Sequence, residues 1–221
     1  MATKTKKAYR GLGMEGMIAR WYARNTGKDI AEYQKLAEDL AARLPAGADV
    51  LEVAPGPGYL AIELARLGPY RVTGLDISRT FVRMAAENAA RAGVPVAFHL
   101  GNAAAMPFEP DSFDLTVCRA AFKNFTEPVQ ALGEMHRVLK PGGEALVIDL
   151  RPDASPAAID AYVKSKGMGW LNSLLTKWTI KHMLVKRAYS QEQFRQMAAQ
   201  SPFRTCEIRE DALGLEVSLR K

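Results

Sequence analysis

The chain has 221 residues, 48% of them hydrophobic, which is enough for one well-packed core. No run approaches the ~18 consecutive apolar residues that a membrane-spanning helix needs, and the basic N-terminus lacks the apolar stretch of a secretory signal. The two cysteines, Cys118 and Cys206, lie far apart, which argues against a disulfide framework or a zinc site and fits a reducing compartment. We therefore expect a cytoplasmic protein without a membrane span.

The net charge of +6 is concentrated in one segment. Between Tyr162 and Ser190 the basic residues have no acidic counterpart; they are Lys164, Lys166, Lys177, Lys181, Lys186 and Arg187. Such an excess attracts phosphates, anionic lipid head groups or acidic substrates, or it is simply a solvated surface. The sequence leaves these readings open, including peripheral membrane contact, and it leaves the oligomeric state unknown.

Hydrophobic spacing predicts alternating helices and strands between residues 29 and 150. Residues 29–47 carry apolar side chains at helical spacing and end at Pro45 and Gly47. Strands are then predicted over 49–54, 71–76, 96–100, 113–118 and 144–150, with helices over 59–67, 81–92 and 129–139. Strands separated by helices of this length form βαβ crossovers, so we expect an α/β fold, a mostly parallel Rossmann-like sheet with helices on both faces.

The last third of the chain has a different pattern. Ser190 and Gln193 have capping-box spacing and open a predicted helix over 191–200. Two strands, over 203–210 and 214–221, predict an antiparallel hairpin at one edge of the sheet, which brings the strands to seven. We expect a single domain, 1–221, with a helical lid over 1–45, a core over 46–152, a lid insertion over 153–189, and the helix and hairpin over 190–221.

The first predicted strand runs into a Gly-x-Gly turn, Gly56 and Gly58, directly before a helix. Because glycine has no Cβ, a ligand can approach this backbone closely, and the helix N-terminus favours a carboxylate or phosphate. Asp76 ends the next strand, where a carboxylate can accept both hydroxyls of a ribose. The pattern predicts a ribose-containing ligand with an anionic or zwitterionic tail.

The loop by itself is compatible with more than one ligand. "GPGYLA" also satisfies the dinucleotide fingerprint, with Ala61 in the third position and Asp76 at the expected distance. A glycine turn that binds nothing is a further reading. The loop residues do not decide among them.

Four blocks of sequence distinguish these readings: "LEVAPGPGYLAIELA", "VTGLDIS", "GNAAAMPFEPDSFDLTVCRAAFKNF" and "EMHRVLKPGGEALVIDLR". In this order and spacing, residues 50–150 resemble the class I S-adenosylmethionine-dependent methyltransferases, especially the small-molecule branch related to the ubiquinone and menaquinone enzymes. The resemblance implies S-adenosyl-L-methionine as the cofactor.

The resemblance also implies roles for individual residues at the cofactor. These would be, for the methionine part, Glu52, Ala54, Gly56, Gly58 and the backbone of Arg119; for the ribose, Asp76; and for the adenine, Ile77, Asn102 and Ala103.

Two positions depart from the family pattern, in which Ala54 is usually glycine and Asn102 is usually aspartate. We expect Ala54 to fit if its φ is negative. We expect Asn102 to accept from the adenine amino group through its carbonyl oxygen. Pro55 and Pro57 stiffen the loop and remove two N–H donors.

In this family the acceptor site is usually built from the N-terminal segment and the insertion after the fifth strand, here about 9–33 and 155–189. Both segments are rich in aromatic residues, which suit a flat aromatic or lipid-like acceptor but are equally typical of ordinary packing. The predicted substrate-binding residues are Trp21, Tyr22, Phe122, Asn124, Trp170 and Trp178.

Candidate general bases are few. If residues 170–182 are helical, His182 shares an apolar arc with Trp170 and Trp178, and this arc either roofs a substrate pocket or packs on the sheet without a chemical role. Asp149, at the end of its strand, is a second candidate. A base helps a hydroxyl or a protonated nitrogen acceptor, whereas an ionised thiol or enolate needs none.

The function favoured by these patterns is methyl transfer to a small hydrophobic or aromatic molecule by in-line displacement, mainly through positioning and desolvation. The basic segments raise nucleic-acid methylation as an alternative, although an RNA-binding module and an "NPPY"-type motif are both missing from the sequence. A non-catalytic cofactor-binding protein is another alternative. No set of acidic metal ligands is recognisable, so we predict no metal.

Overall fold

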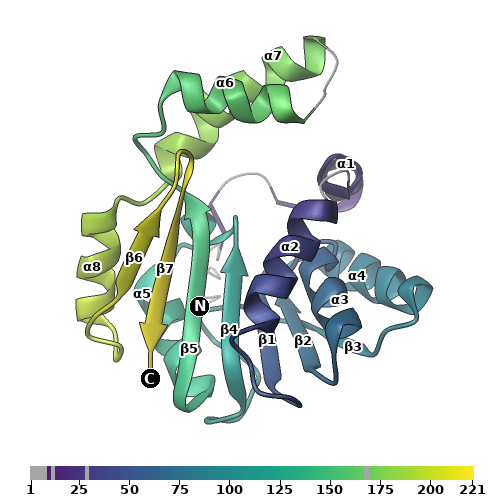
Figure 1. The fold of residues 1–221 in the computed structure, drawn as a ribbon, viewed down its shortest axis with the longest axis vertical. Coiled ribbons are helices and arrows are strands. Elements are labelled where there is room, and N and C mark those ends of the chain that lie inside the picture. The colour runs from purple at the N-terminus through teal and green to yellow at the C-terminus, as the bar shows by residue number, and fades with distance from the viewer. Residues whose placement is uncertain (1–8, 11–12, 28–29, 167–169) are drawn as a thin grey trace, which may run out of the picture.

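The computed structural model describes residues 9–10, 13–27, 30–166 and 170–221, and its centre is a seven-stranded sheet of order β3-β2-β1-β4-β5-β7-β6 (Figure 1). The strands are β1 (Asp49–Val53), β2 (Arg71–Asp76), β3 (Val96–Leu100), β4 (Phe113–Arg119), β5 (Leu139–Leu150), β6 (Glu207–Glu210) and β7 (Gly214–Arg220). The first five pair in parallel, whereas β7 is antiparallel to both β5 and β6. The carboxyl ends of β1 to β5 therefore meet at one edge.

Helices cover both faces of this sheet (Figure 1). One face carries α2 (Ile30–Ala41) and α3 (Tyr59–Leu67), with α4 (Arg79–Ala92) beside α3, and the other carries α5 (Pro128–Val138) and α8 (Gln191–Gln200). Helix α4 ends at Gly93 in the left-handed conformation, with φ of 68°. The predicted capping box is present, since Ser190 and Gln193 exchange hydrogen bonds at the start of α8.

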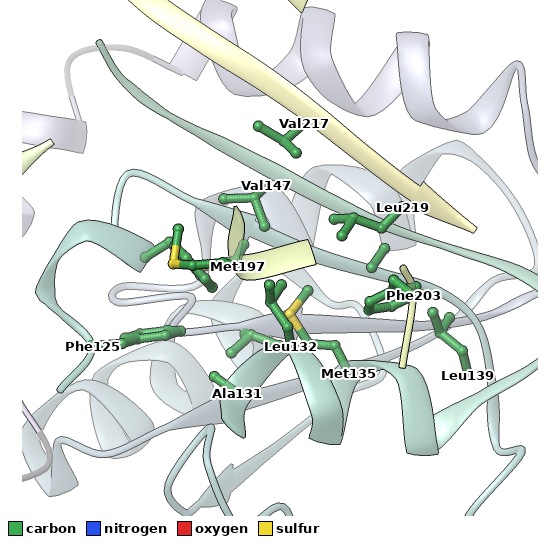
Figure 2. Close-up of a cluster of buried hydrophobic side chains, with 14 of the residues drawn as sticks. Phe125, Ala131, Leu132, Met135, Leu139, Val147, Met197, Phe203, Val217 and Leu219 are labelled. Carbon is green, nitrogen blue, oxygen red and sulfur yellow. The ribbon is translucent and has the colours of Figure 1, made fainter. Parts of the chain in front are cut away.

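The larger core lies on the α5 and α8 face (Figure 2). Leu132 and Met135 of α5 and Met197 of α8 pack against Val147 of β5 and Val217 of β7. Each of these side chains is buried, and full burial of one is worth about 1.5–3 kcal/mol. A second core holds α2 and α3 on the opposite face, so α2 belongs to the packed layer and not to a lid.

A helical lid stands beyond the carboxyl edge of the sheet (Figure 1). It consists of α6 (Pro156–Ser165) and α7 (Trp170–Thr179), and α7 continues through a π-helical turn, Ile180–Leu184, and a 3-10 turn, Val185–Arg187. The lid has its own small core of Ile159, Val163 and Ile180. In the described part of the chain, no helix combines the length and the hydropathy required to cross a bilayer.

The predicted fold class is confirmed: the sheet is seven-stranded, mostly parallel and closed at one edge by the β6–β7 hairpin. Two strand boundaries differ from the prediction by more than one residue. Strand β5 begins at Leu139, because Phe113 already pairs with Leu139 before the ladder shifts register. Strand β6 begins only at Glu207, because Phe203 is buried and Arg204 adopts a positive φ of 67°, which is incompatible with a regular strand.

Candidate active site

The turn after β1 has two glycines with different local roles. Gly58 has φ of 81°, and a Cβ there would lie 2.8 Å from the ring of Phe98 and 2.9 Å from the Cβ of Ala85. Gly58 is therefore required by close packing of the α3 N-terminus. At Gly56, with φ of 56°, the only neighbour a Cβ would meet among the described residues is the Tyr22 ring at 3.8 Å, so this backbone is the one open to a ligand.

Ala54 overturns one expectation. Its φ is +58°, not negative, while its N–H donates to the Leu75 carbonyl at 2.7 Å. The left-handed conformation costs a residue with a Cβ roughly 1–2 kcal/mol, and glycine adopts it without this cost.

Asp76 ends β2 with its carboxylate tied to both sides of the turn. Its Oδ2 accepts from the Gly56 N–H at 3.0 Å and its Oδ1 accepts from the Ser78 N–H at 2.8 Å. Burial raises the pKa of Asp76 to about 6, against the lowering effect of those two backbone donors. Each oxygen retains an unused lone pair, so the carboxylate is fixed in place and can accept two hydroxyls.

Glu52 lies one strand away and is almost fully buried. Its Oε2 accepts from the Ala61 N–H at 2.9 Å, so it caps the first turn of α3 from within the sheet. Burial raises the pKa of Glu52 to about 8, although the Ala61 N–H and the Arg119 charge act to lower it. The side chain is thus mostly protonated at neutral pH in the free protein.

The residues predicted for the adenine are Ile77, Asn102 and Ala103. Ile77, directly after β2, is 44% exposed, and an apolar side chain left open beside a ribose site suits a flat base. Asn102 holds its own loop, because its Oδ1 accepts from the Ala104 N–H at 3.0 Å. Ala103, which lies between Asn102 and Ala104 in the sequence, is half-buried against the main core.

Helix α1 (Gly16–Thr26) covers the turn from above. Its Tyr22 lies beside Gly56 and makes an edge-to-face contact with Phe81, with ring centroids 5.8 Å apart. Burial raises the pKa of Tyr22 to about 12, with Tyr9 and Asp149 adding to the rise. The pKa of Tyr9 is likewise raised, by burial and by Asp76 and Asp149. Both phenols therefore stay neutral.

The start of α1 is anchored on the start of α4. Glu15 accepts from the Arg79 N–H at 3.0 Å and the Thr80 N–H at 3.1 Å, and the Ser78 hydroxyl donates to the Met14 carbonyl at 2.6 Å. Because the Ser78 N–H also donates to Asp76, the Asp76 carboxylate and the start of α1 share one support.

Asp149, a predicted base, forms a buried ion pair. Its Oδ1 lies 2.7 Å from Nζ of Lys123, and the side chains are only 3% and 2% exposed. The backbone N–H of Lys123 donates to Oδ2 at 2.9 Å and the Leu150 N–H donates to Oδ1 at 2.8 Å. Asp149 is therefore held by three donors, which favours a structural role over proton transfer.

The predicted acceptor residues are not brought together. Trp21, Trp170 and Trp178 are mostly exposed, and the ring of Phe122 is fully buried, stacked on Phe194 at 5.6 Å between centroids. Asn124 is buried, and within the described residues its Oδ1 has no hydrogen-bond partner. The side chain of His182 lies outside the described part of the structure.

The prediction for Arg119 concerns its backbone, and the structure adds what its side chain does. The guanidinium lies 4.5 Å above the ring of Tyr33 and 3.4 Å from Glu32 of α2, and Glu32 also pairs with Lys166 of the lid. Arg119 thus links β4 to α2 and, through Glu32, to the lid. Sequence reasoning missed the roles of Tyr9, Ser78 and Lys123 altogether. Only Ser78 has a recognisable signal, because serine before a helix is a common N-cap.

The geometry fits the cofactor that the resemblance implies. An open backbone at Gly56, a fixed carboxylate at Asp76 and an exposed Ile77 follow one another along the carboxyl edge, and Tyr22 lies over the first of them.

Comparison with known proteins agrees with this reading, since the family described as "Methyltransferase domain" matches residues 51–147. These residues are similar to a methyltransferase domain. The matched range contains β2 to β4 and most of β1 and β5, and it includes every predicted cofactor residue. The nicotinamide reading of the loop is not supported.

Relatives and solved structures extend the similarity beyond this methyltransferase domain. The chain is 36% identical over 107 residues to the demethylmenaquinone methyltransferase of Deinococcus radiodurans, covering 48% of this chain and 44% of the relative. It is 35% identical over 127 residues to that of Thermus thermophilus, covering 57% of each. The chain thus spans about half the length of the curated relatives it matches.

The fold is shared over nearly the whole chain with a Methanococcus maripaludis protein assigned as an S-adenosyl-L-methionine-dependent methyltransferase. The TM-score is 0.80 at 19% identity, over 98% of this chain and 97% of that one. At this identity the likeness shows the shared fold. Within the described residues, no group of three or more His, Cys, Asp or Glu side chains could hold a metal ion.

Proposed function

We propose that this protein transfers a methyl group from S-adenosyl-L-methionine to a small aromatic acceptor of the quinol type. The observation that carries the proposal is the carboxylate of Asp76, tied by Gly56 and Ser78 directly beneath the covering helix α1. The names of the two curated relatives, which specify demethylmenaquinone as the acceptor, support the quinone class.

The bound cofactor would supply an activated methyl group on a sulfonium. Asp76 would hold the ribose hydroxyls, the open backbone at Gly56 would lie against the methionine part, and Ile77, Asn102 and Ala103 would surround the adenine. Because these groups are fixed before the ligand arrives, little ordering entropy is lost on binding.

The chain's own contribution to the reaction would be positioning and exclusion of water. Tyr22 lies beside Gly56 and Tyr9 pairs through its backbone with Phe125, so both are placed to cover the reacting atoms. Asn124 offers a buried carbonyl oxygen that can accept from an acceptor hydroxyl. Orientation of two reactants in a dry site is worth several kcal/mol of the barrier.

A general base has a limited role in this proposal. An ionised quinol reacts at oxygen, or at the ring carbon beside it, without prior proton removal at the site. We assign any base function to His182 in preference to Asp149, because Lys123 already pairs with the Asp149 carboxylate.

The test is calorimetric titration with S-adenosylhomocysteine and, separately, with NAD. We expect the first to bind and the second to be silent. Asp76→Ala should weaken binding about 100-fold, since two hydrogen bonds to a charged group are lost. Binding to the unchanged protein should also weaken as the pH falls through about 6, where Asp76 takes up a proton. Asp153→Ala, which removes an exposed carboxylate, is the matched control.

Binding of NAD, or unchanged binding by the Asp76→Ala variant, would contradict the cofactor assignment. With binding established, methyl transfer is assayed with reduced naphthoquinones and with single-stranded RNA. Activity on the RNA alone would overturn the acceptor class while leaving the cofactor site in place.

A further inference from the structure

The lid carries a stripe of large, exposed apolar side chains. Trp170, Leu174 and Trp178 recur every fourth residue along α7 and are 80%, 62% and 54% exposed. Their spacing places them on one face of the helix. The buried core of the lid is a separate set, Ile159, Val163 and Ile180, which packs α6 against the turn that follows α7. The stripe is therefore distinct from this core.

A second apolar surface lies on α1 at the same end of the molecule. Met17 is 82% exposed and Trp21 is 61% exposed, with Ile18 beside them at 41%. Figure 1 shows α1 and the lid helices α6 and α7 all beyond the edge at which the parallel strands end. Soluble monomers rarely leave so many large apolar groups open in one region, and such patches mark contact with a partner or a membrane.

The charges around these side chains favour one kind of surface. The exposed basic residues on the same elements are Arg20, Arg24, Lys164, Lys181 and Lys186. The segment 161–190 has no acidic residue. A helix that is too short to span a bilayer, and that carries tryptophan and leucine flanked by lysine and arginine, has the composition of an interfacial helix. The apolar face of such a helix enters the head-group region of the bilayer.

We propose that α7 and α1 dock this protein on an anionic lipid bilayer. The Trp170–Leu174–Trp178 stripe and Trp21 would enter the head-group layer, and the basic side chains around them would bind anionic lipids. In this orientation, the end of the protein that carries the candidate active site faces the membrane. It stands on exposure and charge alone and does not require the proposed methyl transfer.

The test is co-sedimentation of the full chain with vesicles of phosphatidylcholine alone and of equimolar phosphatidylcholine and phosphatidylglycerol. We expect binding to the mixed vesicles and a shift of tryptophan fluorescence to shorter wavelength on binding. The triple variant Trp170→Ser, Leu174→Ser, Trp178→Ser should bind at least about 10-fold more weakly, because it loses most of the inserted apolar area. Lys181→Gln should weaken binding about 5-fold at low salt and less at high salt.

Leu67→Ser is the matched control, since Leu67 is an exposed apolar residue at the end of α3, away from the lid. It should bind vesicles as the unchanged protein does. Circular dichroism and the thermal midpoint show whether each variant is folded.

Three results would overturn the proposal. One is that the unchanged protein ignores both kinds of vesicle. Another is that the triple variant remains folded and binds as tightly. The third is that the stripe is the interface of a dimer, so that the unchanged protein sediments as a dimer and the triple variant as a monomer. Because vesicle binding needs no cofactor, a negative result here leaves the S-adenosylhomocysteine titration unaffected.

Discussion

The carboxyl edge of the sheet and the lid differ in which side chains they bury and which they expose. At the edge, Glu52, Asp76 and Asp149 are buried and each is held by backbone N–H donors. In the lid, the Lys177–Asp160 ion pair lies at the surface, and Trp170 and Leu174 are mostly exposed. The edge thus has the fixed polar groups that we propose bind a small ligand, whereas the lid has the exposed apolar surface that we propose binds a bilayer.

The buried Lys123–Asp149 pair and the exposed Lys177–Asp160 pair give the sharpest test of this contrast. Lys123→Met leaves the Asp149 carboxylate buried without its cation, so we expect a loss of about 3–5 kcal/mol in the free energy of unfolding. Lys177→Met removes the corresponding cation from the lid pair, and the expected loss is at most about 1 kcal/mol. Urea denaturation of both variants measures the difference.

The double variant Lys123→Met, Asp149→Asn separates charge burial from lost packing. Asparagine keeps a carbonyl oxygen for the backbone donors but carries no charge, so part of the loss should be recovered. Equal losses from Lys123→Met and Lys177→Met would mean that the edge is hydrated and that the contrast does not hold.

Glu52 allows a second test, through pH. Because its pKa is raised from 4.5 to about 8 in the folded chain, the folded state keeps a proton that the unfolded state releases between these values. Stability is therefore lost as the pH rises through this window, by up to about 1.4 kcal/mol per pH unit. Glu52→Gln stays neutral and still accepts from the Ala61 N–H. Its stability advantage should grow by about 2 kcal/mol between pH 5.5 and pH 7.5.

Glu87→Gln, on the exposed face of α4, is the control for this experiment and should show no comparable pH dependence. If the advantage of Glu52→Gln is the same at both pH values, then Glu52 is ionised in the folded protein and Arg119 compensates its charge.

How far the sequence predicts each region follows from the same contrast. The edge is built from local patterns, a glycine turn and an acid at a strand end, and Asp76, Gly56 and Ile77 lie where these patterns put them. The resemblance added the cofactor, which the loop alone left open. Lys123 was missed because its partner, Asp149, is 26 residues away and no periodicity connects them.

The lid was harder to predict for a physical reason. An amphipathic period shows that one face of a helix is apolar, but not whether that face meets the sheet or the surroundings. Trp170 and Trp178 fit the predicted arc, yet both are mostly exposed, whereas Val163 and Ile180 form the buried core of the lid.

Ala54 is the smallest test and concerns the strain stored at the edge. Its positive φ costs roughly 1–2 kcal/mol, whereas glycine has no such cost but loses more entropy on folding, by about 0.4–1 kcal/mol. Ala54→Gly should therefore stabilise the protein by about 0.5 kcal/mol. Ala97→Gly, in β3 with an ordinary φ, should instead destabilise it by about 0.5–1 kcal/mol. A loss of stability in both variants would show that the Ala54 side chain makes stabilising contacts and that the turn is unstrained.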